Sequence, residues 1–491
     1  MADDEGRHQH KSHHFLVVAY GVQGHINPAR VLAHRLTQLG VDGSGSVLAT
    51  LSVQVAAHRR MFPSLDGDME TTDGVISYAP HSDGLDDSSM PKDAEDWVRR
   101  RRASSKSLST IVAGLADRGR PVTCIICTMV LQHVLDVARE HSIPLAIYWI
   151  QPATVLAVGY HYFHGYDEVI AAHAVDTACE VCLPGLNRPL RIGSFPSYLV
   201  DTSGSEMSKA IKDLFRELFE YIDQWRPKVL VNTFNELEEN ALIEMKQHLD
   251  MFVIGPMVGS SMEERIHLFT HDDAEKKRYM EWLGAQQEKS VVYVSFGSMT
   301  KKTKKQMDEI IRGLQQCGRP YLLVMRKDGL EDDDGSHSLE NPHSQGMVVD
   351  WCNQLDVLSH PAVGCFVSHC GWNSTIEAMA SGVPVIGVPN MFDQPTNVYL
   401  VEEEWGVGVR AQRNIDGVLT ATELARCIGL VMDLGEKAMA IRERARALKE
   451  LVQAAGNIGG SSERDLIDFV ETIKAHDTIS VNKSMSGSVK T

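Results

Sequence analysis

The stretch from Trp351 to Gln394 combines the patterns of a strand, a turn and a helix start, and so limits how the chain can fold. Residues 363–367 form a short apolar run with β-branched and aromatic side chains, which predicts a buried strand. A helix is expected at residues 374–380, and Gly371 lies in the turn between them. Glycine lets backbone approach a ligand closely, and the first amides of a helix can bind an anion. The pattern therefore predicts a phosphate site.

Ser374 and Glu377 allow a simpler interpretation of the same helix start. Their spacing fits a capping box, in which the two side chains bond backbone amides of the first turn. In that case neither side chain needs a ligand. The two residues taken alone leave both interpretations open.

Short apolar runs alternate with amphipathic stretches along the whole chain. Residues 15–19 predict the first buried strand, and a helix is expected to start with Asn27 as its cap and Pro28 in its first position. A chain of 491 residues is too long for one ordinary core. We therefore expect an α/β fold of two doubly wound, Rossmann-like domains that face a cleft. The expected divisions are a flexible tail at 1–14, an N-terminal domain at 15–255, a linker at 256–275, a C-terminal domain at 276–475 and a flexible tail at 476–491.

Composition limits the class of partner. The formal charge of −17 argues against general affinity for nucleic acid or anionic membranes, so a small molecule fits better. No apolar run is long enough to span a membrane, and the polar N-terminus lacks the apolar core of a secretory signal. Nine cysteines without such a signal indicate reduced thiols. We expect a cytoplasmic monomer.

The stretch from Trp351 to Gln394 closely resembles the signature box of the plant family-1 UDP-glycosyltransferases. An ungapped match of this length is far more specific than a lone glycine motif. The resemblance covers nearly the whole chain and implies the GT-B arrangement. The acceptor would lie mainly on the N-terminal domain and the UDP-sugar mainly on the C-terminal one, with the last helix crossing back.

The resemblance also implies roles for individual residues of the box. Trp351 would stack on uracil beside Cys352 and Gln354, and Glu377 would accept hydrogen bonds from the ribose hydroxyls. An indole face and a carboxylate suit a base and a pair of hydroxyls. The implied diphosphate contacts come from the box and from the turn after the strand 291–295: His369, Gly371, Asn373, Ser374, Ser295, Gly297 and Ser298. The implied sugar contacts are Trp372, Asp393 and Gln394, and glutamine at the last position is the family's usual sign of glucose.

His25 is the candidate catalytic base. It is expected in the loop after the first strand, at the sheet edge where α/β folds bind ligands. The segment 23–28 resembles the family motif in which a histidine takes the proton of the acceptor hydroxyl. The family usually orients that histidine with an aspartate at the end of the strand 121–128, where this chain has Thr128. A threonine hydroxyl can accept a hydrogen bond but supplies no negative charge.

The expected reaction is an inverting, metal-independent transfer of glucose from UDP-glucose to an oxygen of a small lipophilic plant metabolite, such as a flavonoid, an anthocyanin or another phenol. Thr128 and residues 149–155 and 160–166 look most like a subgroup with anthocyanin 5-O-glucosyltransferases and enzymes that esterify carboxylic acids. Formation of a glucose ester on a carboxylic acid is therefore an alternative, because such an acceptor demands little of the base. A non-catalytic UDP-sugar binder is a third possibility, motivated by Thr128.

Other patterns carry less weight. Asp332 and Asp334 have the spacing of a metal-holding Asp-x-Asp pair, but the acidic run looks like a solvated loop. Cys124 and Cys127 lie in one expected strand, where this spacing places them on opposite faces. No metal site and no cofactor other than the donor substrate are expected. The glycines near His25 lack the dinucleotide-binding spacing, which disfavours a dehydrogenase.

Overall fold

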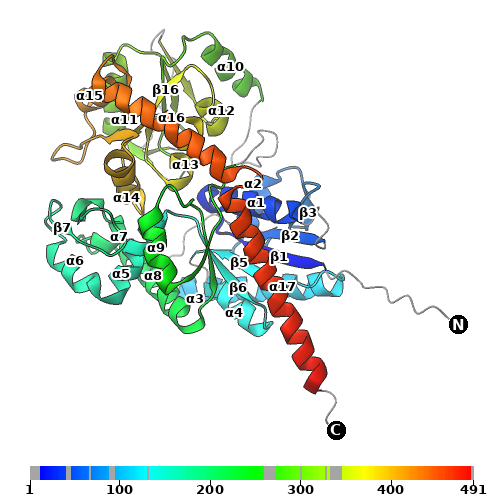
Figure 1. The fold of residues 1–491 in the computed structure, drawn as a ribbon. Coiled ribbons are helices and arrows are strands. Elements are labelled where there is room, and N and C mark those ends of the chain that lie inside the picture. The colour runs from blue at the N-terminus through cyan, green and yellow to red at the C-terminus, as the bar shows by residue number, and fades with distance from the viewer. Residues whose placement is uncertain are drawn as a thin grey trace.

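The structure is a computed structural model. It describes residues 12–39, 46–65, 68–87, 94–129, 132–258, 273–298, 301–326, 329–331 and 345–487. Two large sheets belong to two layers of the molecule, the C-terminal one above the N-terminal one in Figure 1. Residues 259–272 of the predicted linker at 256–275, and the pair Asp332 and Asp334, lie outside the described residues, and the last three residues of that linker belong to a helix that begins at Asp273.

The first sheet has the strand order β10-β9-β6-β5-β1-β2-β4-β3. Its pairs are parallel except for β3 with β4. Its strands are β1 (His13–Val18), β2 (Val47–Ser52), β3 (Thr71–Thr72), β4 (Ser77–Tyr78), β5 (Cys124–Thr128), β6 (Leu145–Trp149), β9 (Lys228–Val231) and β10 (Asp250–Val253).

The N-terminal segment also carries the helices that cover this sheet and a small hairpin. The helices are α1 (Gln23–Gln38), α2 (Val55–Met61), α3 (Ala94–Asp117), α4 (Gln132–Glu140), α5 (Ala153–His161), η1 (Tyr162–Tyr166), α6 (Asp167–His173), η2 (Ile192–Ser194), α7 (Ser197–Val200), α8 (Glu206–Trp225) and α9 (Glu239–His248). The hairpin pairs β7 (Glu180–Val181) with β8 (Leu190–Arg191).

The second sheet is parallel throughout, in the order β15-β13-β11-β16-β17-β18. Its strands are β11 (Val291–Ser295), β13 (Tyr321–Val324), β15 (Gly346–Val349), β16 (Val363–Ser368), β17 (Val385–Gly387) and β18 (Gly408–Arg410), and beside it β12 (Lys302–Thr303) pairs with β14 (Leu330–Glu331). The helices are α10 (Asp273–Gly284), α11 (Lys304–Gln316), α12 (Gln354–Leu358), α13 (Trp372–Ser381), α14 (Gln394–Tyr399), η4 (Leu400–Glu404), α15 (Ala421–Met432), α16 (Glu436–Gly456) and α17 (Ser461–Gly487).

The central strands of both sheets are buried along their whole length, as β1, β5, β11 and β16 show. Strands that are apolar on both faces need helices on both faces, which is why the chain alternates strand and helix. The predicted fold class, two Rossmann-like domains in an α/β architecture, is confirmed.

The first strand begins earlier than the sequence predicted. His13 and His14, assigned to the N-terminal tail, are buried in β1. The two ring nitrogens of His14 lie 2.8 Å from the Arg120 carbonyl and 2.8 Å from Thr50 Oγ1. Because both ring nitrogens are satisfied, a polar residue can continue a buried strand.

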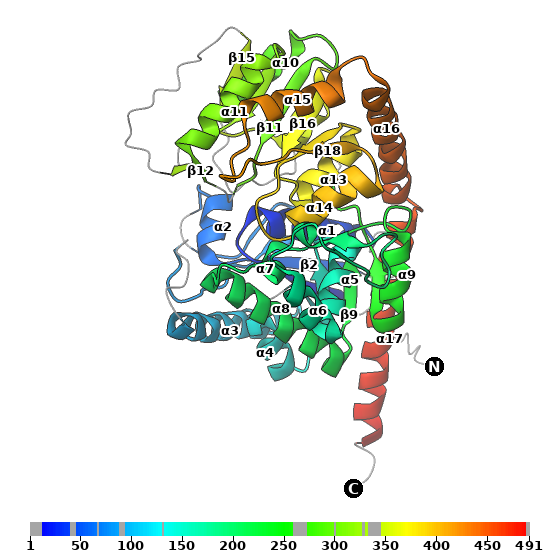
Figure 2. The ribbon, with the colours of Figure 1, turned by 90° about the vertical axis from the view of Figure 1, so that its left-hand side faces the viewer.

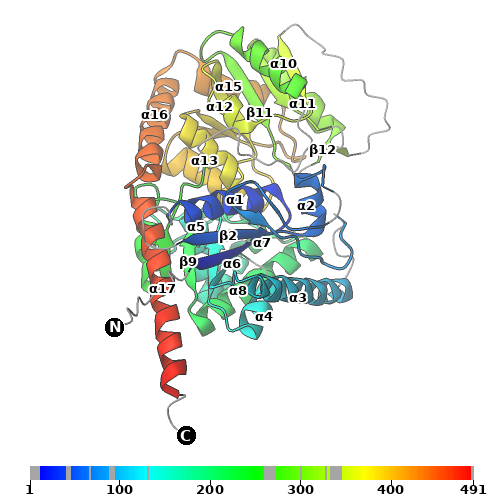
Figure 3. The ribbon, with the colours of Figure 1, turned by 90° about the vertical axis from the view of Figure 1, so that its right-hand side faces the viewer.

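The last helix crosses back to the N-terminal domain. Figures 2 and 3 show α16 beside the upper domain and α17 beside the lower one. The Phe469 ring on α17 lies 6.0 Å from the ring of Phe15 and 5.5 Å from that of Phe252, and Asp465 accepts the Val253 N–H at 2.8 Å. The backbone of α17 is helical to Gly487, beyond residue 476, where a flexible tail was expected. Across the described residues, no helix is both long and apolar enough to cross a bilayer.

Candidate active site

Each sheet has one place where the direction of strand order reverses. In the first sheet β1 leads toward β2 and β4, whereas β5 leads toward β6 and β9, so the reversal lies between β1 and β5. In the second sheet it lies between β11 and β16. Ligands of open α/β sheets bind outside the carboxyl ends of the strands at such reversals. His25 follows β1 and Thr128 ends β5, while Gly297 follows β11 and His369 follows β16.

His25 lies in a helix and not in the loop that the sequence predicted. α1 begins at Gln23, so His25 is in its first turn and Pro28 is inside the helix. The Val22 carbonyl accepts the N–H groups of His25 and Ile26, both at 3.0 Å, and so starts the helix one turn early. A proline at this depth removes only one helical hydrogen bond. Pro28 therefore did not mark the helix start.

Thr128 is the hydrogen-bond partner of the candidate base. His25 Nδ1 lies 2.9 Å from Thr128 Oγ1, and the Tyr20 ring packs edge-on with its centroid 5.8 Å from that of His25. Burial lowers the pKa of His25 to about 4, and a hydrogen bond with the Thr128 backbone acts in the opposite direction. The imidazole is therefore neutral near pH 7. With Nδ1 donating to Thr128, Nε2 can accept a proton.

At the second reversal the ring of His369 fits between two glycines. A Cβ at Gly297 would lie 2.7 Å from ring atoms of His369, and one at Gly371 would lie 2.6 Å from its Nε2. Gly297 also has a φ of +76°, which side chains disfavour. Within the described part of the chain, the buried Nδ1 of His369 has no hydrogen-bond partner. The ring nitrogen that faces both glycines is Nε2, so Nε2 is the atom placed to donate to a ligand in this turn, such as a phosphate oxygen.

The charge next to His369 comes from a lysine that the sequence argument missed. Burial, and then the charge of Lys302, lower the pKa of His369 to about 4, whereas a hydrogen bond with the Ser295 backbone raises it. His369 is thus a neutral hydrogen-bonding group near pH 7. Lys302 is buried, and its Nζ lies 4.7 Å from the Phe296 ring centroid. Lys302 stands in the lysine-rich run 301–305, which is typical of a solvated surface. No local pattern therefore indicated that Lys302 would be buried.

The helix start after His369 has no side-chain cap, which corrects the capping-box interpretation. α13 begins at Trp372, two residues earlier than expected, with Gly371 in the cap position. Ser374 Oγ and Glu377 Oε2 each accept a hydrogen bond from Gln354 Nε2, both at 2.8 Å. Ser374 and Glu377 therefore hold the side chain of Gln354. The start of α13 keeps the positive end of the helix dipole directed at the turn beside His369.

The uracil-side residues of the predicted box gather around Tyr293 on β11. Its hydroxyl lies 3.3 Å from Cys352 Sγ and donates to Gln354 Oε1 at 3.3 Å. Cys352 is buried and Trp351, directly before it, is half-buried. The structure thus places Cys352 and Gln354 against Tyr293 and joins Gln354 to Glu377, with Trp351 directly before Cys352 in the chain.

The three predicted sugar contacts take part in fixing the local structure. Asp393 accepts from Asn397 Nδ2 at 2.7 Å, and burial raises its pKa to about 6. Gln394 Oε1 accepts the backbone N–H groups of residues 390 and 391 at 2.9 and 3.1 Å. The Trp372 indole N–H donates to the Asn232 carbonyl at 2.7 Å, so its polar atom is directed at the N-terminal domain.

The two reversals are in contact across the domains. Asn373 Nδ2 donates to the carbonyl of Gly24 at 3.0 Å, next to His25. Figure 3 shows α13 directly above α1. The segments that carry the predicted base and the predicted donor box, separated by more than 300 residues in sequence, therefore lie in direct contact. Ser298 directly follows Gly297, and its carbonyl accepts a hydrogen bond from Arg326 Nη1.

Four polar side chains that the sequence argument missed surround the carboxyl edge of the first sheet. Gln54 and His81 form an isolated bridge after β2 and β4, and the rings of His81 and His133 are 5.3 Å apart. Among the described residues, the buried atoms without a partner include Gln54 Oε1, His81 Nε2, Gln132 Nε2 and His133 Nε2. They are candidate contacts for acceptor hydroxyls. Only their positions after strand ends could have indicated them.

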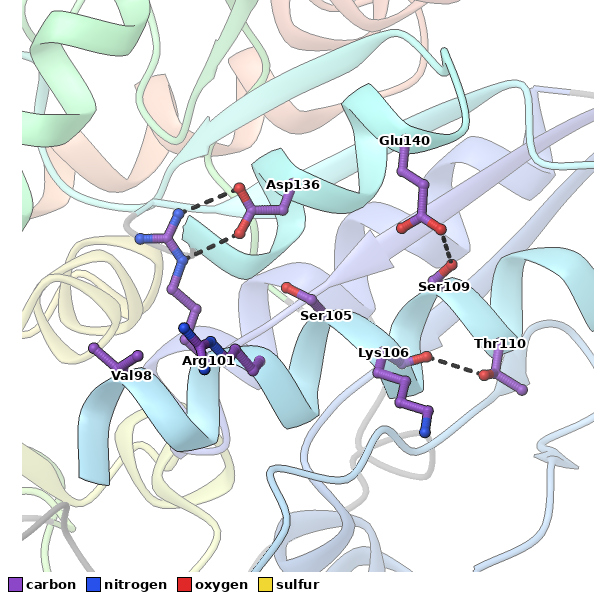
Figure 4. Close-up of a pocket in the computed structure, with 9 residues that line it drawn as sticks. Val98, Arg101, Ser105, Lys106, Ser109, Thr110, Asp136 and Glu140 are labelled. Atoms are coloured by element: carbon purple, nitrogen blue, oxygen red, sulfur yellow. Dashed lines mark hydrogen bonds and ion pairs between the residues drawn. The ribbon is translucent and has the colours of Figure 1, made fainter. Parts of the chain in front are cut away.

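A surface groove of about 650 Å³ between α3 and α4 contains none of the predicted site residues (Figure 4). Arg101 pairs with Asp136 at 3.1 Å, and Ser109 donates to Glu140 at 3.1 Å. Because these polar side chains bond one another and no predicted site residue lies there, we place the candidate active site between the domains and not in this groove.

Two opposed Rossmann-like domains, each with its site at a strand-order reversal, define the GT-B class of glycosyltransferases. The family model described as UDP-glucoronosyl and UDP-glucosyl transferase matches residues 260–441. The chloroplastic crocetin glucosyltransferase of Gardenia jasminoides is 39% identical over 93% of this chain and 97% of its own. Anthocyanidin 3-O-glucoside 5-O-glucosyltransferase 1 of Perilla frutescens is 36% identical over 93% of this chain and 98% of its own. The solved structure of Os79 from O. sativa with U2F and trichothecene has a TM-score of 0.78 and 27% identity, covering 94% of this chain and 100% of that one.

The chain therefore belongs to the plant family-1 UDP-glycosyltransferases. Both the predicted family and the predicted subgroup are confirmed, and the chain is a UDP-glucosyltransferase enzyme of small-molecule metabolism.

Proposed function

We propose that this enzyme catalyses inverting, metal-independent transfer of glucose from UDP-glucose to an oxygen of a small lipophilic plant metabolite such as a flavonoid, an anthocyanin or another phenol. The observation that carries the proposal is the contact of Asn373 with the carbonyl of Gly24, next to His25. It joins the donor box to the candidate base. The names of the crocetin and anthocyanidin glucosyltransferases, together with Gln394, support glucose as the sugar.

On the donor side, the proposal assigns each part of UDP-glucose to a cluster already described. Uracil stacks on Trp351 beside Cys352 and Gln354, and the ribose hydroxyls donate to Glu377. The diphosphate lies between the Gly297 turn and the start of α13, where His369 Nε2, the ring nitrogen that faces both glycines, donates to a phosphate oxygen. The remaining proposed contacts are Ser295, Ser298, Gly371, Asn373 and Ser374 for the diphosphate, and Trp372, Asp393 and Gln394 for the sugar.

The reaction is a single displacement. His25 Nε2 takes the proton of the acceptor hydroxyl, the acceptor oxygen forms a bond to the anomeric carbon, and the bond from that carbon to the UDP oxygen breaks on the opposite face. One displacement inverts the anomeric centre. UDP leaves with its bonding electrons, and the α13 dipole, the His369 N–H and the buried Lys302 stabilise its charge. These groups supply positive potential without a metal ion.

Glucose ester formation on a carboxylic acid is the second candidate, and the Thr128 contact favours it. Thr128 lends His25 no negative charge, and the pKa of His25 is about 4, so the imidazole is a weak base. A weak base suits an acceptor that ionises easily, such as a carboxylic acid or an acidic phenol. The crocetin glucosyltransferase shows that a relative acts on a carboxylic metabolite.

Transfer of labelled glucose from UDP-glucose to a panel of phenols and carboxylic acids tests both candidates. We expect His25→Ala to lower kcat/KM for phenols by about 10²- to 10⁴-fold, and to lower it far less for carboxylic acids, which are already ionised at neutral pH. Alkaline lability of the product identifies an ester. UDP-glucose binding without transfer to any acceptor would instead favour the non-catalytic binder, and activity indifferent to His25 for every acceptor would assign the base elsewhere.

We also propose a role for each domain, a monomeric state and a cytoplasmic location for the enzyme. Residues 15–255 would bind the acceptor and residues 276–475 the donor, with 256–275 as the linker. One chain contributes both halves of the site, so a monomer suffices. Nine cysteines, none paired among the described residues, agree with the reducing cytoplasm.

A further inference from the structure

Pro28 leaves one carbonyl of α1 without its helical partner. In a regular helix the N–H of residue 28 would donate to the carbonyl of Gly24, but proline has no N–H. The proline ring also crowds the carbonyl four residues earlier and tilts it away from the helix axis. The Gly24 carbonyl accepts from Asn373 Nδ2 instead, at 3.0 Å. The proline thus creates an acceptor that faces the other domain.

Asn373 is placed to connect this carbonyl with the donor. It is the second residue of α13, at the helix start beside His369. Its amide nitrogen carries two hydrogens, so one can bond Gly24 while the other bonds a phosphate oxygen. The Gly24 carbonyl belongs to the same helical turn as His25. A bound UDP-sugar that orders the Asn373 side chain therefore also orders the turn of α1 that carries His25.

We propose that Pro28 is a positioning residue that couples occupation of the donor site to the placement of His25, through the Gly24 carbonyl and Asn373. This inference rests on the proposed donor site. Pro28 itself has no role in holding UDP. Its replacement should therefore break the coupling while donor affinity falls by no more than that coupling, a separation that a purely structural proline would not produce.

Hydrogen exchange at the start of α1, with and without UDP, tests the coupling. In the wild type we expect UDP to slow exchange of the amides of residues 25 and 26 by about 5-fold or more, the usual lower bound of coupling between sites. In Pro28→Ala the new N–H competes for the Gly24 carbonyl, so the UDP-dependent slowing should largely disappear. Because coupling is reciprocal, UDP should bind this variant more weakly by no more than the coupling that is lost, about 1 kcal/mol for a 5-fold effect.

Pro189→Ala is the matched control, because Pro189 is exposed in a connecting segment and carries the same change in unfolded-chain entropy. It should keep the full effect of UDP. Pro28→Ala removes a helix breaker, so it should fold, and circular dichroism checks this. Equal UDP-dependent slowing in Pro28→Ala and wild type overturns the inference, as does loss of the slowing together with UDP affinity. Absence of UDP binding in the wild type overturns the proposed function itself.

Discussion

The most informative single contact in this protein is the one between His25 and Thr128. A hydroxyl orients the imidazole as a carboxylate would, at 2.9 Å from Nδ1, but lends it no charge. The sequence located both residues and allowed their hydrogen bond. It could not predict the burial that lowers the pKa of His25 to about 4, because burial depends on the packing of elements far apart in the chain.

Introducing the missing charge should change the pH dependence in a defined direction. Below its pKa His25 is protonated and cannot accept a proton, so the acid limb of kcat/KM reports that pKa. In Thr128→Asp a carboxylate stabilises the imidazolium, and we expect the acid limb to move up by about 1 to 3 pH units. The stronger base should also raise turnover of weakly acidic alcohols relative to carboxylic acids.

Thr128→Asn is the matched control for this measurement, since it has the shape of aspartate without its charge. Its acid limb should stay near that of the wild type. An equal shift in both variants, or no shift in Thr128→Asp, would show that the acid limb reports another group.

At the scale of elements, the proposed donor site is a strand, a turn and a helix start. The apolar run predicted β16 almost to its ends, and the glycines predicted a close backbone approach. The start of α13 was misplaced because Ser374 and Glu377 match a capping pattern locally, while their partner Gln354 is remote in sequence. Local patterns locate such elements, but only the folded chain decides which side chains meet.

Gly297→Ala should damage donor binding in particular. Its Cβ would meet the His369 ring at 2.7 Å, and its φ of +76° costs an alanine about 1–2 kcal/mol. We expect UDP, titrated calorimetrically, to bind about 10-fold or more weakly. The comparison variant is Gly435→Ala, where a Cβ meets nothing within 4 Å and φ is −138°. If both variants bind UDP like the wild type, the diphosphate does not lie against this turn.

At the scale of the whole molecule, function depends on how two similar domains face each other. Alternation of strands and helices was sufficient to predict two doubly wound domains. The contacts that join them, from Asn373 to Gly24, from Trp372 to Asn232 and from α17 to the first sheet, link residues that no local pattern pairs. They place the reversal of each sheet against the other, so that one substrate pair can touch both.

A crystal structure with a non-transferable UDP-glucose analogue measures this arrangement directly. We expect uracil on Trp351, the diphosphate between Gly297 and the start of α13, and the anomeric carbon facing His25 Nε2 with room for one acceptor oxygen between them. A donor bound elsewhere, or a sugar directed away from His25, would contradict it.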